Sequence, residues 1–275
     1  MVKGSLLELN NIEKIIVNSP VASIYSKPQF KSELITQALF YESLKIIDKR
    51  KKWYKVKLLD GYEGWIHSFY TYELFGKFEK NINISKYWVK KKFTNLIFND
   101  GTSLTLSFGS LLPCLEFDNK IIIKLYDGRE GELDKNDLSS YENPLKLSEF
   151  IDLHINQFLG IQYLWGGKSS FGFDCSGLIQ TILNVCGISK FPRDTSKQIS
   201  SKFLSPISGM PSKGDIIFFK KSNIVNHVGI YINDYCFIHS SGSVKINSLS
   251  NSSEYFSENL KSMKNQIFRL SNYVK

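Results

Sequence analysis

The residues with the clearest chemical potential are one cysteine and two histidines in the C-terminal half of the chain. Cys175 stands in Gly172-Phe173-Asp174-Cys175-Ser176-Gly177-Leu178, where a segment with helical spacing begins. Unpaired backbone N–H groups and the positive end of the dipole favour a thiolate at such a position. His227 and His239 follow 52 and 64 residues later, each in a strand-like run. This pattern predicts a cysteine nucleophile served by two histidines.

The spacing of the two histidines predicts that they act together. They are 12 residues apart, with Asn233-Asp234 as the turn between them. A short loop of odd length at that turn places both side chains on one face of a hairpin. A neutral imidazole at His227 can then take the Cys175 proton, while His239 bonds the other ring nitrogen and fixes its orientation.

Zinc is the main alternative for these side chains, with Cys236 or Cys186 as a fourth ligand. If His239 faces the site, strand alternation turns Cys236 to the opposite face. Cys186 follows Cys175 by eleven residues, which is about three turns or roughly 16 Å along the same helix. The pattern therefore favours a site with no metal and no cofactor.

The elements around these residues predict an α+β domain. Apolar residues at helical spacing run from Leu147 to Leu159 and stop at Gly160. A second helix is expected over Cys175 to Cys186, ended by Gly187. Strands are expected at three places: Asp215 to Phe219, His227 to Ile232 and Cys236 to His239.

The N-terminal half has a different pattern, with short period-two runs and Asp-Gly turns over residues 20 to 140 that indicate antiparallel sheets. It also repeats itself at an offset of 67 residues, where Lys57-Leu58-Leu59-Asp60-Gly61-Tyr62-Glu63-Gly64-Trp65-Ile66 returns as Lys124-Leu125-Tyr126-Asp127-Gly128-Arg129-Glu130-Gly131-Glu132-Leu133. Each string predicts a hairpin in which glycine supplies the positive φ of the turn. Two copies of one small β-barrel fit this half.

Four separate motifs in the C-terminal half resemble the NlpC-type cell-wall peptidases, papain-like cysteine enzymes that cut peptidoglycan peptides. The motifs are Tyr163-Leu164-Trp165-Gly166-Gly167, Asp174-Cys175-Ser176-Gly177-Leu178, Gly214-Asp215-Ile216-Ile217-Phe218-Phe219, and His227-Val228-Gly229-Ile230-Tyr231 with His239 downstream. The N-terminal repeats resemble bacterial SH3-like barrels, with Gly64-Trp65-Ile66 as the usual signature and Glu132 in place of the tryptophan in the second copy.

The resemblance implies a multi-domain chain: two small all-β SH3-like barrels, followed by an α+β papain-like catalytic domain with a central antiparallel sheet. The expected boundaries are an N-terminal extension at 1–19, a first barrel at 20–76, a divergent second barrel at 77–141 and the catalytic domain at 142–275.

The resemblance also implies roles for individual residues. Cys175, His227 and His239 match the family's nucleophile, general base and orienting residue. The backbone N–H of Cys175, with Tyr163 nearby, would meet the oxyanion.

Members with SH3-like barrels, the γ-D-glutamyl-L-diamino acid endopeptidases, are most similar to this chain. In those enzymes the residues matching Asp174 and Ser176 hold the free N-terminal amine of the substrate, as acceptors suited to an ammonium group. Tyr62 is similar to the barrel tyrosine that closes the amine pocket, and Glu33 is its expected companion.

Composition limits the remaining classes of protein. With 42% apolar and 22% charged residues the chain is expected to be globular, and no apolar run approaches the roughly 18 to 20 residues of a spanning helix. The N-terminus has no secretory h-region and the four cysteines form no framework, so we expect a cytoplasmic protein. The net charge of +9 raises nucleic acid or an anionic surface as partners, but the basic clusters at Lys49 to Lys52 and Lys90 to Lys92 are typical of solvated faces.

The expected substrate is therefore a peptidoglycan-derived peptide, with no nucleic acid and no membrane as partner. The expected reaction is hydrolysis of the γ-D-glutamyl to diamino-acid bond in L-Ala-γ-D-Glu-diaminopimelate peptides, in the recycling of wall fragments. Two other classes stay open at this point. One is an acyltransferase or amidase in which an amine or alcohol takes the place of water. The other is a non-catalytic module that binds wall peptides.

Overall fold

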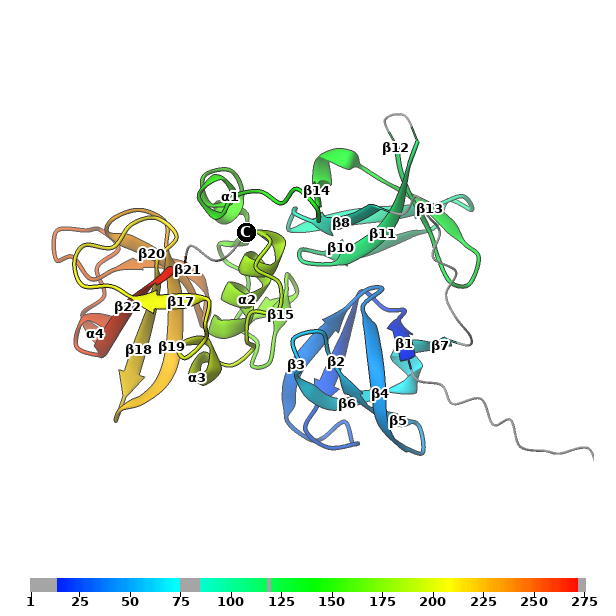
Figure 1. Cartoon of the computed structure of the whole chain (residues 1–275), viewed down its shortest axis with the longest axis horizontal. Helices are drawn as coiled ribbons and strands as arrows, with labels where there is room; N and C mark the ends of the chain where they lie inside the picture. The colour runs from blue at the N-terminus through cyan, green and yellow to red at the C-terminus, as the bar shows by residue number, and fades with distance from the viewer. Residues whose placement is uncertain (1–13, 75–84, 118–119, 272–275) are drawn as a thin grey trace, which may run out of the picture.

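The computed structural model describes residues 14–74, 85–117 and 120–271 (Figure 1). These residues form two seven-stranded sheets in the N-terminal half and a six-stranded sheet in the C-terminal half. In Figure 1 the helix α2 (Cys175–Val185) lies between the six-stranded sheet and the two N-terminal sheets.

The first sheet has the strand order β3-β2-β6-β5-β4-β1-β7. Its strands are β1 (Lys14–Val17), β2 (Val21–Tyr25), β3 (Leu34–Leu39), β4 (Ser43–Arg50), β5 (Trp53–Lys57), β6 (Glu63–His67) and β7 (Thr71–Leu74), with a short 3-10 helix at Ser68–Tyr70. The predicted start at residue 20 is too late, because β1 pairs with both β4 and β7 and so belongs to the sheet. The rest of the predicted extension, residues 1–13, lies outside the described residues.

The second sheet repeats that order strand for strand, as β10-β9-β13-β12-β11-β8-β14. Its strands are β8 (Ser85–Val89), β9 (Phe93–Phe98), β10 (Ser103–Ser107), β11 (Leu111–Phe117), β12 (Lys120–Lys124), β13 (Glu130–Leu133) and β14 (Leu138–Ser140), with a 3-10 helix at Lys135–Asp137. Residues 77–84, where the predicted second domain begins, lie outside the described residues.

The sequence repeat corresponds to the same hairpin in both sheets. In the first, Gly61 has φ +85 and the Asp60 carboxylate accepts from the Tyr62 N–H at 2.9 Å. In the second, Gly128 has φ +86 and Asp127 accepts from the Arg129 N–H at 3.1 Å. A left-handed glycine after a turn aspartate thus reverses the chain in both copies, and the two predicted hairpins are confirmed.

The C-terminal half begins with α1 (Leu147–His154), which continues as a 3-10 helix at Ile155–Phe158. A two-stranded ribbon then leads into α2, and the long sheet has the order β17-β22-β18-β19-β20-β21 with every pair antiparallel. Its elements are β15 (Lys168–Ser169), β16 (Gly172–Phe173), α3 (Thr195–Gln198), β17 (Leu204–Pro206), β18 (Ile216–Lys221), β19 (Ile224–Tyr231), β20 (Cys236–Ser241), β21 (Ser243–Ser248), α4 (Glu258–Lys261) and β22 (Lys264–Leu270).

The six-stranded sheet buries both faces. One face packs against α2 and α1 through residues such as Leu178, Ile182 and Val228. The other face carries Phe219 and Phe237 under Leu260 of α4. Helix α2 is itself almost wholly buried, which explains its apolar stripe.

The second sheet is anchored in the catalytic core by the turn after β10. Phe108 in this turn is fully buried, with its ring 4.6 Å from that of Phe158 and 5.6 Å from that of Phe150. Next to it, Ser107 Oγ accepts from the Ser170 backbone N–H at 2.8 Å. The second sheet and the catalytic half therefore share one apolar core.

No helix among residues 14–74, 85–117 and 120–271 is long and apolar enough to span a membrane.

This shared core predicts that the two parts unfold together. Phe108→Ala removes a buried ring that both parts contact, so we expect a loss of about 3 to 5 kcal/mol in the free energy of unfolding. Phe171→Ala is the matched control, because Phe171 packs against Phe93 of the second sheet but is 43% exposed. Denaturant unfolding of both variants measures the difference, and equal small losses would contradict the shared core.

Candidate active site

The nucleophile position is set by the start of α2. Asp174 is the N-cap residue in extended conformation, and its carboxylate accepts from the Gly177 N–H at 2.6 Å. Cys175 is the first helical residue and is 8% exposed. Its backbone N–H lies at the helix terminus, where donors are not used within the helix. The predicted helix start at Cys175 is confirmed.

The two histidines meet across the β19–β20 hairpin. His227 Nε2 lies 2.7 Å from His239 Nδ1. Both rings share a face with the aromatic side chains of Phe219 and Phe237, whose centroids lie 5.8 Å from His227 and 5.4 Å from His239 respectively. The prediction that both histidines lie on one face of the hairpin is confirmed.

The electrostatics of this group favour neutral side chains at rest. Burial, helped by the Asp174 carboxylate, raises the pKa of the Cys175 thiol to about 12, against opposing hydrogen bonds from the backbone of Val228 and Ser176. Burial, together with the neighbouring His239 and with Lys245, lowers the pKa of His227 to about 3. Burial also lowers the pKa of His239 to about 4. The expected benefit of the helix dipole for a thiolate is therefore outweighed by desolvation.

A pocket of about 140 Å³ opens beside Cys175. Six of the eight residues selected from the sequence line it: Glu33, Tyr62, Tyr163, Asp174, Cys175 and Ser176. The other two, His227 and His239, form a hydrogen bond with each other. Asn226, the residue before His227 in the sequence, also lines the pocket. Two separate parts of the chain thus form one cavity, since Glu33 and Tyr62 directly precede strands β3 and β6 of the first sheet.

Tyr163 is held close to the nucleophile by the backbone. It forms an isolated bridge with Phe173, two residues before Cys175, and its N–H donates to the Gly242 carbonyl at 2.9 Å. Burial raises the pKa of its hydroxyl to about 12, and proximity to Cys175 contributes to that shift. The neutral hydroxyl is thus available as a donor near the thiol.

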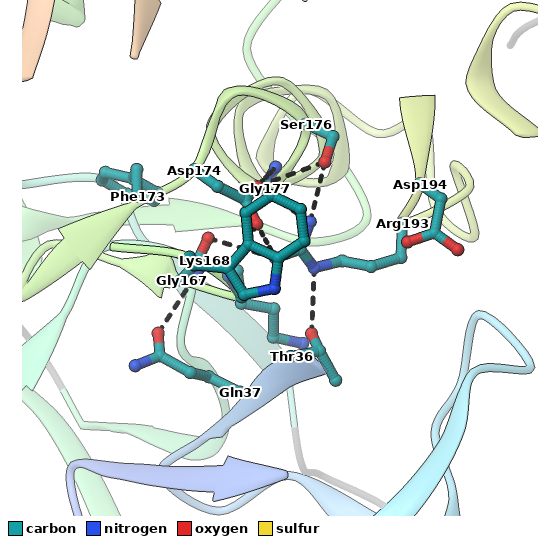
Figure 2. Close-up of polar contacts among 12 residues, drawn as sticks. Thr36, Gln37, Gly167, Lys168, Phe173, Asp174, Ser176, Gly177, Arg193 and Asp194 are labelled. Carbon is teal, nitrogen blue, oxygen red and sulfur yellow. Dashed lines mark hydrogen bonds and ion pairs between the residues drawn. The ribbon is translucent and has the colours of Figure 1, made fainter. Parts of the chain in front are cut away.

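Arg193 is a central residue that the sequence reasoning missed. Its side chain is 2% exposed and forms an ion pair with Asp174 at 2.6 Å (Figure 2). The same guanidinium donates to Ser176 Oγ at 2.8 Å and to Thr36 Oγ1 at 3.0 Å, so it connects the start of α2 with strand β3. The available signal was the string Phe191-Pro192-Arg193-Asp194-Thr195, which places two adjacent charges directly before a short helix.

The carboxylate of Asp174 is fully occupied by protein groups. Besides Arg193 and Gly177, it accepts from the Gly166 N–H at 2.9 Å and from Ser176 Oγ at 3.2 Å. Asp174 and Ser176 line the pocket as predicted, but their polar atoms hold the guanidinium. These contacts give both residues a part in shaping the site, and the direct amine contact expected from the sequence stays a prediction.

Asp194 is a second missed residue that lines the pocket. Tyr62 donates its hydroxyl to Asp194 at 3.1 Å, and Trp165 donates its indole N–H to Glu33 at 3.0 Å. Both bonds join the N-terminal half to the C-terminal half. They bring two carboxylates and a phenol into the lining of the pocket.

The cysteines proposed as further zinc ligands lie elsewhere. Cys236 Sγ lies 3.8 Å from Ser253 Oγ, and Cys186 follows the last residue of α2. In the part of the chain that the structure describes, no three His, Cys, Asp or Glu side chains gather as a metal site would require.

The raised thiol pKa and lowered imidazole pKa predict that transfer of a proton from Cys175 to His227 is unfavourable in the free protein. At pH 7 we expect no thiolate absorbance at 240 nm in the difference between wild type and Cys175→Ser. The rate of Cys175 alkylation by iodoacetamide, followed by mass spectrometry, should still rise above pH 8. The unfolded protein, whose thiols have a pKa of about 8.5, is the control. A rate that is already level at pH 7 would instead indicate a preformed thiolate–imidazolium pair.

Comparison with known proteins places this geometry in a family. Residues 160–265 match the NlpC/P60 family, and residues 24–68 match the bacterial dipeptidyl-peptidase Sh3 domain. The chain is 34% identical to the γ-D-glutamyl-L-lysine dipeptidyl-peptidase of Bacillus cereus, over 76% of this chain and 68% of that protein. It is 29% identical to the protein of the same name from Bacillus subtilis, over 74% of this chain and 71% of that protein.

A solved structure has the same overall architecture. The crystal structure of an NlpC/P60 family protein from Bacillus cereus superposes with a TM-score of 0.80 at 26% identity, covering 94% of this chain and 99% of that one. The resemblance drawn from the four motifs is thereby confirmed: the chain belongs to the NlpC/P60 family of cysteine peptidases and carries an SH3-like domain before its catalytic domain.

Proposed function

We propose that this enzyme hydrolyses the γ-D-glutamyl to diamino-acid bond of peptidoglycan-derived peptides that have a free N-terminal L-Ala, and so releases L-Ala-γ-D-Glu. The names of the Bacillus relatives support a dipeptidyl-peptidase of this kind. The observation that carries the proposal is a pocket that Cys175 lines together with two carboxylates, Glu33 from the N-terminal half and Asp194 from the C-terminal half.

The charges in the pocket suit an ammonium group. Four charged side chains line it, and two of them, Asp174 and Arg193, neutralise each other. Glu33 and Asp194 remain, with the Tyr62 hydroxyl between the domains. We assign the amine of L-Ala to this acidic end, because charge-assisted hydrogen bonds to carboxylates are the strong ones.

A cation already approaches this end from outside. Lys197 Nζ lies 5.4 Å from the centre of the Tyr62 ring and 4.0 Å from Asp194. The lysine side chain is 67% exposed, so this ion pair is worth little and a bound substrate amine can replace it.

The closed end also selects the form of the substrate. In intact peptidoglycan the nitrogen of the first L-Ala is an amide and carries no charge, and the glycan attached to it would have to pass the first sheet. A short pocket closed by carboxylates therefore favours released peptides over the wall itself. This supports a role in the recycling of wall fragments.

We assign the following chemistry to the site. Cys175 attacks the γ-carbonyl carbon of D-Glu while His227 takes the thiol proton, and His239 orients His227. The oxyanion lies at the start of α2, near the Cys175 N–H and the Tyr163 hydroxyl. The proton then passes from His227 to the departing amine of the diamino acid. Water hydrolyses the thioester by the reverse proton route, and the thiol is restored.

The proposed activity is tested with synthetic L-Ala-γ-D-Glu-diaminopimelate and its N-acetylated form, with products read by mass spectrometry. We expect the free tripeptide to be cut into L-Ala-γ-D-Glu and diaminopimelate, at a rate more than a hundredfold above that of the acetylated peptide, because acetylation removes the positive charge that Glu33 and Asp194 would bind and adds bulk at the amine. Comparable rates on both peptides would refute the closed amine pocket. Recovery of only intact tripeptide, under reducing conditions at neutral pH, would refute the activity.

Variants of the acidic end locate the amine. Asp194→Asn and Glu33→Gln each remove one charged acceptor, which predicts a loss of about 10- to 100-fold in kcat/KM on the free tripeptide and little change on the acetylated one. Glu63→Gln is the matched control, since Glu63 lies on the same sheet but pairs with Lys55 and Lys57 outside the pocket.

The two histidines are expected to differ in importance. His227→Asn removes the proton acceptor, and general-base assistance is typically worth about 10² to 10⁴-fold in rate. His239→Asn keeps an amide oxygen that can accept from the imidazole N–H, so we expect measurable activity to remain. Single-turnover hydrolysis of the tripeptide compares them, with Cys175→Ala as the inactive reference. Equal losses in the two histidine variants would show that base and orienting residue are wrongly assigned.

A further inference from the structure

The polar contact between His227 and His239 continues beyond His239. On the side of the ring away from His227, His239 Nε2 lies 2.9 Å from Asn247 Oδ1. Asn247 is on β21, opposite Phe237, and therefore faces the same side of the sheet as both histidines. We propose that Asn247 is a positioning residue that fixes the tautomer of His239 and, through it, selects the ring nitrogen with which His227 acts as base.

The orientation of the Asn247 amide follows from its other contact. Its Nδ2 donates to the Tyr255 carbonyl oxygen at 3.0 Å. A carbonyl oxygen can only accept, so the NH₂ group must face Tyr255 and the amide oxygen must face His239. That carbonyl is itself held by the Ser248 backbone N–H at 2.8 Å, so the backbone of the β21 region sets the amide.

The amide oxygen then determines the protons on both imidazole rings. Asn247 Oδ1 can only accept, so His239 Nε2 carries the hydrogen and Nδ1 of the neutral ring has the lone pair. His239 Nδ1 must accept from His227 Nε2, at the observed 2.7 Å. The lone pair of neutral His227 is therefore on Nδ1, the nitrogen that His239 does not engage. Only this tautomer leaves a basic nitrogen available to Cys175.

An amide suits this place better than a carboxylate. The titratable or charged groups with a contact or charge interaction to His239 are His227 on β19 and Lys245, directly opposite it on β21. Burial lowers the pKa of His239 and Lys245 lowers it too, against the Asn247 hydrogen bond, which raises it, and the balance keeps the ring neutral. A carboxylate at position 247 would favour the imidazolium. Its Nδ1–H would then donate to His227, and His227 would have no lone pair left for Cys175.

The inference rests on the proposed catalytic roles of Cys175 and His227, so its first test does not need substrate. The chain has four histidines, which makes its ¹⁵N-imidazole spectrum simple. Long-range ¹H–¹⁵N correlations of the whole protein at pH 7 should show the Nε2–H tautomer for His227 and His239, assigned with His227→Asn and His239→Asn. An Nδ1–H tautomer at His239 in the wild type would overturn the proposal whether or not the tripeptide is cut.

Variants at position 247 provide the second test. Asn247→Asp should raise the pH at which His239 becomes protonated. The acid limb of kcat, and of Cys175 alkylation by iodoacetamide, should move upward by the same amount. Asn247→Leu should leave a mixture of tautomers and lower kcat by about 10- to 100-fold with KM little changed, as loss of an outer orienting partner does elsewhere.

The matched control is Asn265→Asp on β22, an exposed asparagine that donates to the Met263 carbonyl. It should change neither the tautomers nor the acid limb. If Asn247→Asp and Asn265→Asp have the same titration of His239 and the same acid limb, Asn247 has no positioning role. A folded Asn247→Leu variant with wild-type kcat and wild-type tautomers would also show that Asn247 has no positioning role.

Discussion

The buried ion pair between Arg193 and Asp174 is the interaction on which the site depends. A guanidinium that is 2% exposed requires a partner, because an unpaired buried charge costs several kcal/mol. Asp174 is also the N-cap of α2, and Arg193 also reaches Thr36 on the first sheet. One pair of charges therefore sets the helix start that presents Cys175 and connects this start to another domain. Because the two charges cancel, the net charge of the pocket comes from its other charged side chains.

The two N-terminal sheets have the same strand order but make different contacts with the catalytic half. The first supplies polar side chains to the pocket, and its strand β3 also holds the Lys168 backbone N–H through Gln37 at 2.9 Å. The second supplies an apolar anchor, Phe108, to the core behind α2. Duplication of one sheet thus provided a wall for the pocket and a support for the helix. The divergence between the two hairpin sequences is consistent with these separate roles.

The polar chain behind Cys175 orders the protons of the site. Three hydrogen bonds connect Tyr255, Asn247, His239 and His227 in that order. In each bond, the group that donates and the group that accepts are determined by the preceding bond. The fixed starting point is a backbone carbonyl, which has no alternative protonation state. Because the imidazole groups are buried and neutral, such a chain orients the base without adding charge near the thiol.

The sequence alone determined the local features of this protein. Strand alternation and the short odd-length loop between His227 and His239 were enough to place both on one face, and the helical spacing of the residues that follow Cys175 was enough to place it at a helix start. Repeated Asp-Gly strings predicted the two matching hairpins. These features depend on contacts between residues close in the chain, or on a single turn.

Only the tertiary structure decided the rest. Strand β22 inserts between β17 and β18, and Asn247 reaches His239, through pairings that no local pattern encodes. The pairing of Asp174 with Arg193 was missed for the same reason: a carboxylate beside a nucleophile has the same local sequence whether or not a buried arginine pairs with it. Arg193 lies 19 residues further along the chain, and only packing of the loop that carries it brings its guanidinium to Asp174.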